Sequence, residues 1–231
     1  SAEKTVLSLQ QPKAAMDRDF VLNVKAPQAR RSFALCGADG DGAAALASFQ
    51  PFFPGLRQAR SLNLAIVIDC SGSMGGDSIE QAKEALEGIL AGLQPRDRTT
   101  IVRFGSTARA LSSGLLACNN ANLDKARTFA RQLDADMGGT EIAGALLTAY
   151  EALRGYEAAD ILLVTDGEVA DWEPVVEVAK ATGHRIFTVG VGSAVSESFV
   201  RQLASATGGG CELVSPNEDM PERIVRHFER M

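Results

Sequence analysis

Residues 62–77 read LNLAIVIDCSGSMGGD, and this stretch gives the clearest indication of the fold of most of the chain. Its apolar run at 65–68 is rich in β-branched residues and ends abruptly at the carboxylate of Asp69. A run of this kind is typical of a strand that is buried on both faces of a parallel sheet. Asp69 is therefore predicted at the carboxyl end of a central strand, where open α/β sheets bind their ligands.

The residues after this strand carry oxygen atoms at regular spacing. Ser71 and Ser73 occupy alternate positions after Asp69, and the neighbouring glycines allow the chain to turn sharply. The three side chains can then point into one small volume. Carboxylate and hydroxyl oxygens suit Mg²⁺ or Mn²⁺, and the set contains neither Cys nor His, which favour zinc and copper.

Two later stretches can supply further oxygen ligands. Residues 161–167, ILLVTDG, form a second apolar run whose end at Asp166 predicts a strand end at the same edge of the sheet. Thr140 follows two glycines and precedes a helical pattern, so its hydroxyl is expected on a loop. Small hydroxyl residues often do no more than cap turns and helices. Two carboxylates at adjacent strand ends repel each other, however, and because a divalent cation removes that cost, we favour metal binding over capping.

The pattern Asp69-x-Ser71-x-Ser73, followed by Thr140 and Asp166, resembles the metal-ion-dependent adhesion site of von Willebrand factor type A domains. All five positions match in the family's order, and the resemblance runs from about residue 62 to residue 231. It implies that these five residues bind Mg²⁺ or Mn²⁺. Because two carboxylates only neutralise the ion, it can accept one more anionic oxygen. In this family that oxygen comes from an Asp or Glu of a partner protein, so the resemblance implies a protein-binding module.

Strand and helix patterns alternate from residue 62 onward. Repeated βα units predict a Rossmann-like, doubly wound α/β fold with a mainly parallel sheet and helices on both faces. A short strand at 108–112 is expected to be antiparallel at the sheet edge. Asp77, with Glu80 three residues later, is expected to open the first helix, and Gly208 to end the fifth. The other strands are expected at 65–68, 99–104, 161–165, 185–191 and 211–214, and the helices at 77–93, 123–133, 141–153, 172–181, 196–206 and 218–231.

Residues 1–60 have a different pattern and are expected to form a small β-rich segment, followed by the second domain at 61–231. Alternation at 20–25 predicts a short strand, and runs at 31–36 and 43–49 flank a glycine-rich loop, which favours a β-hairpin. Residues 16–22 resemble the closing part of the domain that precedes the type A domain in inter-alpha-trypsin inhibitor heavy-chain-like proteins. This resemblance implies that residues 1–60 are the remnant of such a domain.

The composition is that of a globular protein, with 45% hydrophobic and 23% charged residues among 231. The net charge of −6, without any Lys or Arg cluster, argues against nucleic acid or anionic membrane as a partner. No stretch approaches the ~20 apolar residues of a membrane-spanning helix.

The four cysteines form no C-x-x-C pair, which favours reduced, mostly buried thiols in a reducing compartment such as the cytoplasm. A cell-surface or secreted protein with a disulfide stays open as the alternative, although Cys70 itself is expected to be unreactive and unpaired.

Enzyme motifs are incomplete in this sequence. The turn at 72–76 has no Lys for a phosphate-binding loop, and Val195 replaces the third glycine of a dinucleotide fingerprint. Ser71 occupies the position at which a haloacid-dehalogenase-type phosphatase carries its second Asp. His184 and His227, the two histidines, are expected to be structural and partly exposed. We therefore predict a non-enzymatic protein, with two alternatives: a metal-dependent phosphoester hydrolase on the same sheet, and a structural module with a vestigial site.

Acidic residues follow the predicted ligands closely in sequence and are expected to rim the site. They are Glu141, Glu168, Asp171 and Glu173. Each is also a residue type that favours a first helical turn. Together they would reject a uniformly acidic segment, so the partner is expected to place its Asp or Glu beside Lys or Arg.

Overall fold

The computed structural model describes residues 33–39, 42–48, 61–167, 169, 172–192, 195–215, 218–229 and 231. The chain divides into two units, Ser1–Gln58 and Ala59–Met231. In the first unit, β1 (Phe33–Asp39) and β2 (Gly42–Ser48) form an antiparallel hairpin. The hairpin is confirmed, but the expected loop at 37–42 is wrong, because strand pairing continues until Asp39 lies opposite Gly42. The strand expected at 20–25 lies outside the described residues, and the origin of residues 1–60 stays a prediction.

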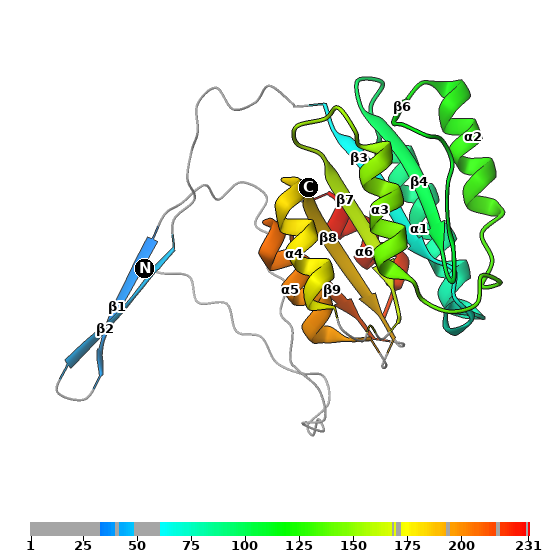
Figure 1. Ribbon diagram of the computed structural model, residues 1–231. Coiled ribbons are helices and arrows are strands. Elements are labelled where there is room, and N and C mark those ends of the chain that lie inside the picture. The colour runs from blue at the N-terminus through cyan, green and yellow to red at the C-terminus, as the bar shows by residue number, and fades with distance from the viewer. Residues whose placement is uncertain are drawn as a thin grey trace, which may run out of the picture. The chain divides into compact units, whose positions relative to one another are not determined.

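The second unit contains a central sheet with the strand order β5-β4-β3-β7-β8-β9 (Figure 1). Neighbouring strands pair in parallel from β4 to β9, and β5 pairs with β4 in the antiparallel direction, as predicted. A further strand, β6, also pairs with β4 and was not predicted, because it has only two residues. The strands are β3 (Asn63–Asp69), β4 (Arg98–Phe104), β5 (Ala108–Ala110), β6 (Leu116–Ala117), β7 (Asp160–Thr165), β8 (Arg185–Val191) and β9 (Cys211–Val214).

In the described part of the chain, six α-helices connect or follow these strands. They are α1 (Asp77–Gly92), α2 (Asn120–Arg131), α3 (Ile142–Ala152), α4 (Glu173–Thr182), α5 (Glu197–Thr207) and α6 (Met220–Phe228). The α2 helix begins earlier than predicted because the Asn119 side chain caps it by accepting the N–H of Asn122 at 3.0 Å. The α1 helix begins at Asp77, as predicted, but its N-cap is Gly76 and no side chain caps it, so Asp77 and Glu80 do not form a capping box. None of the described helices is long and apolar enough to cross a bilayer.

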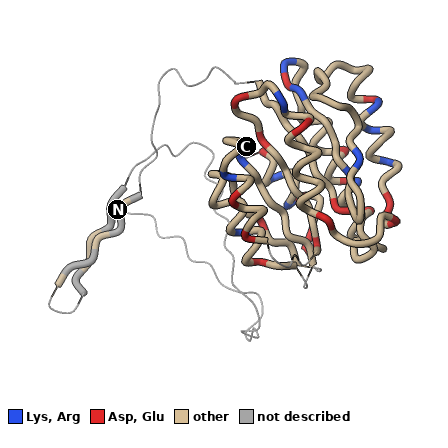
Figure 2. Tube along the Cα trace, in the orientation of Figure 1, with Lys and Arg blue, Asp and Glu red and all other residues tan. Residues whose placement is uncertain are grey.

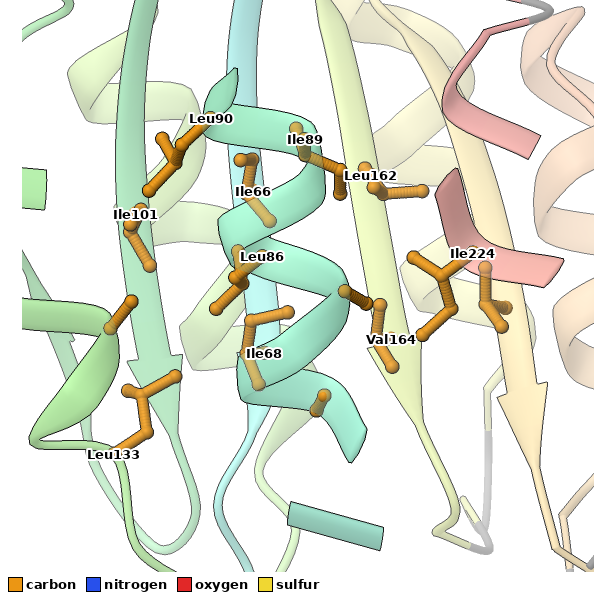
Figure 3. Packing of buried hydrophobic residues seen from close by; sticks show 14 of the residues in the cluster. Ile66, Ile68, Leu86, Ile89, Leu90, Ile101, Leu133, Leu162, Val164 and Ile224 are labelled. Atoms are coloured by element: carbon orange, nitrogen blue, oxygen red, sulfur yellow. The ribbon is translucent and has the colours of Figure 1, made fainter. Parts of the chain in front are cut away.

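Helices cover both faces of the sheet, and β3 contributes to both layers of the core (Figure 1). On one face, Figure 3 shows Ile66 of β3 behind α1, close to Leu86 and Ile89 of that helix. Helices α2 and α6 complete this layer. On the other face, Ala65 and Val67 pack in a second cluster with residues of α3, α4 and α5. This alternation confirms that the apolar run is a strand buried on both sides.

The position of β3 beside β7 places the candidate site. The chain passes from β3 to β4 on one side of β3, and later strands continue from β7 on the other side. The direction of winding therefore changes between β3 and β7. In doubly wound sheets, ligands bind outside the carboxyl ends of the strands at this point. Asp69 ends β3, and Asp166 follows the last residue of β7.

At two glycines in this unit, the same added methyl group is expected to change the free energy of unfolding in opposite directions. Gly144 lies in α3 with open space around it, so Gly144→Ala should raise the free energy of unfolding by about 0.5–1 kcal/mol. A Cβ on Gly209 would lie 2.0 Å from the carbonyl oxygen of Ile186 in β8. Gly209→Ala should therefore lower the free energy of unfolding by about 1–3 kcal/mol. Urea unfolding of both variants measures this, and a shift in the same direction for both would contradict the packing described.

Candidate metal centre

The carboxylate of Asp69 lies at the carboxyl end of β3 and is completely buried. Its Oδ1 accepts a hydrogen bond from the backbone N–H of Ser71 at 2.9 Å, and its Oδ2 accepts one from the hydroxyl of Thr165 at 2.5 Å. Donors of this kind replace the hydration that a buried carboxylate loses. Asp69 is thus held by the turn after β3 and by the last residue of β7.

Side-chain hydrogen bonds continue from this turn to the end of β7. The hydroxyl oxygens of Ser71 and Ser73 lie 3.0 Å apart. The Ser73 hydroxyl donates in turn to Oδ1 of Asp166 at 2.8 Å, across 93 positions of sequence. The turn that carries both serines includes the short 3-10 helix η1 (Gly72–Met74). The structure therefore brings together four of the five residues that the sequence predicts as ligands.

The fifth residue, Thr140, lies on the loop before α3. This loop contacts the turn after β3 and the turn after β7. The N–H of Gly72 donates to the carbonyl of Gly138 at 2.9 Å, so this loop is joined to the turn after β3. A Cβ atom on Gly167 would lie only 2.7 Å from Cγ2 of Thr140 and 3.1 Å from its Oγ1. The Thr140 side chain therefore packs against the turn after β7. The end of β3 and three loops in contact with one another therefore carry all five residues.

The sequence model of the von Willebrand factor type A domain matches residues 63–222, which include all five of these residues. The chain belongs to this family. Type A domains are known for metal-dependent adhesion and protein interaction, and they commonly hold a divalent metal at the adhesion site. The resemblance inferred from the five-residue pattern is therefore confirmed at the level of the family.

Proteins related in sequence support the same assignment. The chain is 32% identical to a von Willebrand factor A domain-containing protein of Dictyostelium discoideum over 163 residues, which cover 69% of the chain and 18% of that protein. It is 34% identical to human inter-alpha-trypsin inhibitor heavy chain H4 over 185 residues, which cover 73% of the chain and 20% of that protein. The chain thus spans about a fifth of the length of the curated relatives it matches.

Solved structures share the fold of the type A domain described here. A von Willebrand factor type A protein from Catenulispora acidiphila superposes with a TM-score of 0.64 at 22% identity, covering 80% of this chain and 43% of that one. Proximal thread matrix protein 1 from the mussel byssus superposes with a TM-score of 0.58 at 20% identity, covering 72% of this chain and 45% of that one. The mussel structure has zinc in its metal-ion-dependent adhesion site.

The electrostatics of the type A domain's site fit a cation. Burial raises the pKa of Asp166; the hydrogen bond from Ser73 opposes this shift, and the nearby charge of Asp69 adds to it. Two carboxylates thus share a small space, and among the described residues their hydrogen-bond network contains no cationic side chain. Among the described residues, no group of three or more His, Cys, Asp and Glu side chains could hold a metal. Hydroxyl oxygens must therefore complete a ligand set here, and this donor chemistry suits a hard divalent ion.

Two residues of the site were missed by sequence reasoning. Thr165 donates to Asp69 and accepts the N–H of Gly167 at 3.1 Å. The role of Thr165 follows from strand register: Ile68 pairs with Val164, so the next residues, Asp69 and Thr165, lie side by side. The sequence of either strand alone does not reveal this register. Ser106 accepts the N–H of Gly139 at 2.8 Å and so holds the loop that carries Thr140.

The acidic rim expected around the site is only partly described. Glu141 and Glu173 are exposed, beside the start of α3 and at the start of α4. Glu168 and Asp171 lie outside the described residues. Figure 2 shows Lys and Arg interspersed with Asp and Glu along the domain.

Both histidines are buried, which corrects the expectation that they are partly exposed. His184 stacks on Tyr150 with ring centroids 6.3 Å apart, and burial lowers its pKa. The Nε2 atom of His227 lies 3.1 Å from the carbonyl oxygen of Gly210. His184 precedes β8 and Gly210 precedes β9, so both rings lie at the amino ends of parallel strands. This is the edge of the sheet opposite Asp69.

All four cysteines are free, as predicted for reduced thiols. Cys70 and Cys118 are buried, but Cys36 is exposed and Cys211 is partly exposed, so the expectation of mostly buried thiols holds for two of them. Burial, and to a lesser extent the charge of Asp69, raises the pKa of Cys70 to about 11. A thiol with this pKa carries little of the reactive thiolate near neutral pH.

We therefore expect a thiol reagent to label Cys36 rapidly and to label Cys70 only when the domain unfolds. Mass mapping of the labelled protein at mildly alkaline pH measures this, with and without denaturant. The Cys36→Ser variant is the matched control and should lose the fast phase at that site. Fast labelling mapped to Cys70 in the folded protein would contradict the burial described.

Proposed function

We propose that this type A domain binds one Mg²⁺ or Mn²⁺ ion and uses it to hold a protein partner. The ligands are Asp69, Ser71, Ser73, Thr140 and Asp166. The ion accepts a carboxylate from an Asp or Glu of the partner. The observation that carries the proposal is the 2.8 Å contact from Ser73 to Asp166 beside the buried Asp69, because it unites the two strand ends in one oxygen-rich group.

The residues of the chain have distinct parts in this proposal. Asp69 and Asp166 supply the negative charge that the cation neutralises, and Thr165 and the Ser71 N–H hold Asp69 in place. The hydroxyls of Ser71, Ser73 and Thr140 add oxygen atoms without charge. When bound, the ion supplies a Lewis-acidic position for one more oxygen ligand. The charges of Asp69 and Asp166 are then neutralised by the ion and no longer repel an anion. A partner carboxylate is therefore the ligand that this position favours.

The identity of the metal is part of the proposal. The oxygen-only donor set favours Mg²⁺ or Mn²⁺. The zinc in the mussel neighbour's adhesion site makes Zn²⁺ the necessary comparison in any titration. Protons compete with the metal, since the pKa of Asp166 is raised. Metal affinity should therefore fall as the pH drops through that pKa, where the carboxyl becomes protonated.

The partner-binding part rests on the family. Type A domains and inter-alpha-trypsin inhibitor heavy chains are typically interaction modules without catalysis. A phosphoester hydrolase on the same sheet is the alternative, and it needs a group that moves a proton near the ion. Both histidines lie at the other edge of the sheet, so neither can serve. Nothing at the site favours the hydrolase over the binding module.

We expect Mg²⁺ or Mn²⁺ to raise the melting temperature of the protein. A ligand at a hundredfold excess over its dissociation constant stabilises the folded state by about 2.7 kcal/mol. For a domain of this size that corresponds to about 5–10 °C. The shift should be absent in Asp69→Asn and Asp166→Asn. It should be unchanged in Asp77→Asn, which removes an exposed carboxylate from the start of α1.

Equal shifts in wild type and in both site variants would contradict the ligand assignment, and the lack of any shift would favour a vestigial site.

The same proteins test partner binding and the alternative of a phosphoester hydrolase. A partner held by the immobilised domain should be released by a chelator and should not bind Asp69→Asn. Metal-dependent turnover of an aryl phosphate that Asp69→Asn abolishes would instead support the hydrolase.

A further inference from the structure

Two arginines face each other beside the candidate metal centre. Arg103 of β4 pairs directly with Arg109 of β5 in the antiparallel register. Side chains at such paired positions lie on the same face of the sheet, with Cβ atoms about 4.5–5.5 Å apart, and like charges there are destabilising. The pair therefore carries a cost that an anion placed between or above the two guanidinium groups would remove.

Both arginines line an open hollow of about 430 Å³. Its other lining residues are Thr107, Asp136, Met137 and Gly138. The wall formed by Met137 and Gly138 also bounds the metal centre. The N–H of Met137 donates to the carbonyl of Cys70 at 3.0 Å, and the carbonyl of Gly138 accepts the N–H of Gly72 at 2.9 Å. The hollow and the metal centre are thus neighbours that share one loop.

Two guanidinium groups and one carboxylate, that of Asp136, line the hollow, so a net positive charge remains, and in the described part of the chain neither arginine forms an ion pair. The guanidinium of Arg103 lies 5.5 Å from the ring centroid of Phe129, and its Nη1 donates to the carbonyl of Gln132 at a long 3.5 Å. Its Nε is buried and lacks a hydrogen-bond partner among the described residues. Arg109 and Asp136 are exposed, and in the same ranges neither forms an ion pair.

A purely structural reading accounts for part of this arrangement. Arg103 reaches the carboxyl end of α2, where a cation is favourable. Arg109 lies on the edge strand of the sheet, and charged side chains on edge strands prevent unwanted pairing with other chains. Neither role requires the two arginines to be directly opposite, and neither places them in a hollow beside the metal centre. A ligand of opposite charge explains both features.

We propose that this hollow, defined by Arg103 and Arg109, binds a second carboxylate of the partner segment whose first carboxylate reaches the metal. The inference rests on the proposed function and adds a charge requirement on the partner. The surface around the metal centre is then not uniformly acidic, because the hollow with Arg103 and Arg109 accepts an acidic side chain of the partner. The partner presents two acidic side chains, one for the ion and one for the arginine pair.

The test uses synthetic glycine–serine peptides with a fluorescent label, measured by anisotropy in Mg²⁺. One peptide carries a single glutamate, and a series carries a second glutamate moved one position at a time. At the best spacing, the second glutamate should tighten binding by about threefold or more, as expected for a partly exposed ion pair. The gain should disappear in Arg109→Gln and reverse in Arg109→Glu.

Arg98→Gln is the matched control, because Arg98 is an exposed arginine at the amino end of β4, away from the end of that strand that pairs with β5. It should keep the full gain. The Mg²⁺-induced rise in melting temperature should be the same in the wild type and in all three variants. A gain that is absent at every spacing, or that persists in Arg109→Gln, would overturn the inference. Loss of the Mg²⁺ shift in the wild type would instead overturn the proposed function.

Discussion

The buried carboxylate of Asp69 is the constraint on which the site depends. It is completely removed from solvent, and two donors, the Ser71 N–H and the Thr165 hydroxyl, replace its lost hydration. Burial raises the pKa of the second carboxylate, Asp166, and the nearby charge of Asp69 adds to that shift. Hydrogen bonds alone leave the net charge of this pair in place. A divalent cation would balance it, which is why the geometry favours a metal site over a set of turn caps.

The doubly wound sheet explains how this crowding arises and how it is held. Neighbouring parallel strands β3 and β7 end at the same edge, at the point where the winding changes direction. Close backbone approaches then fix the loops around that edge. A Cβ on Gly105 would lie 2.3 Å from the carbonyl oxygen of Met137, and one on Gly167 would meet Thr140. Loops fixed in this way present their oxygens without further ordering, so little entropy is lost when a ligand binds.

Much of the fold could be predicted from the sequence because its strands are long, apolar and buried. The runs that became β3 and β7 end at carboxylates, so strand position and candidate ligand were predicted together. Thr140 could not be predicted in this way, because its neighbours in sequence indicate only a loop. Its role as a candidate ligand came from the family pattern. Thr165 and the buried state of His184 depend on register and packing between distant segments, which no local pattern encodes. The hairpin loop was placed too wide because glycines favoured a turn where strand pairing continues.

Crystals of the protein grown with Mn²⁺ can show directly whether these loops hold one divalent ion. Anomalous scattering from manganese locates the ion independently of any assumed ligand. We expect one peak among the side-chain oxygens of Ser71, Ser73, Thr140 and Asp166, beside Asp69, and no such peak in crystals of Asp69→Asn. A fully ordered wild-type site without manganese, or an ion bound elsewhere on the domain, would contradict this expectation.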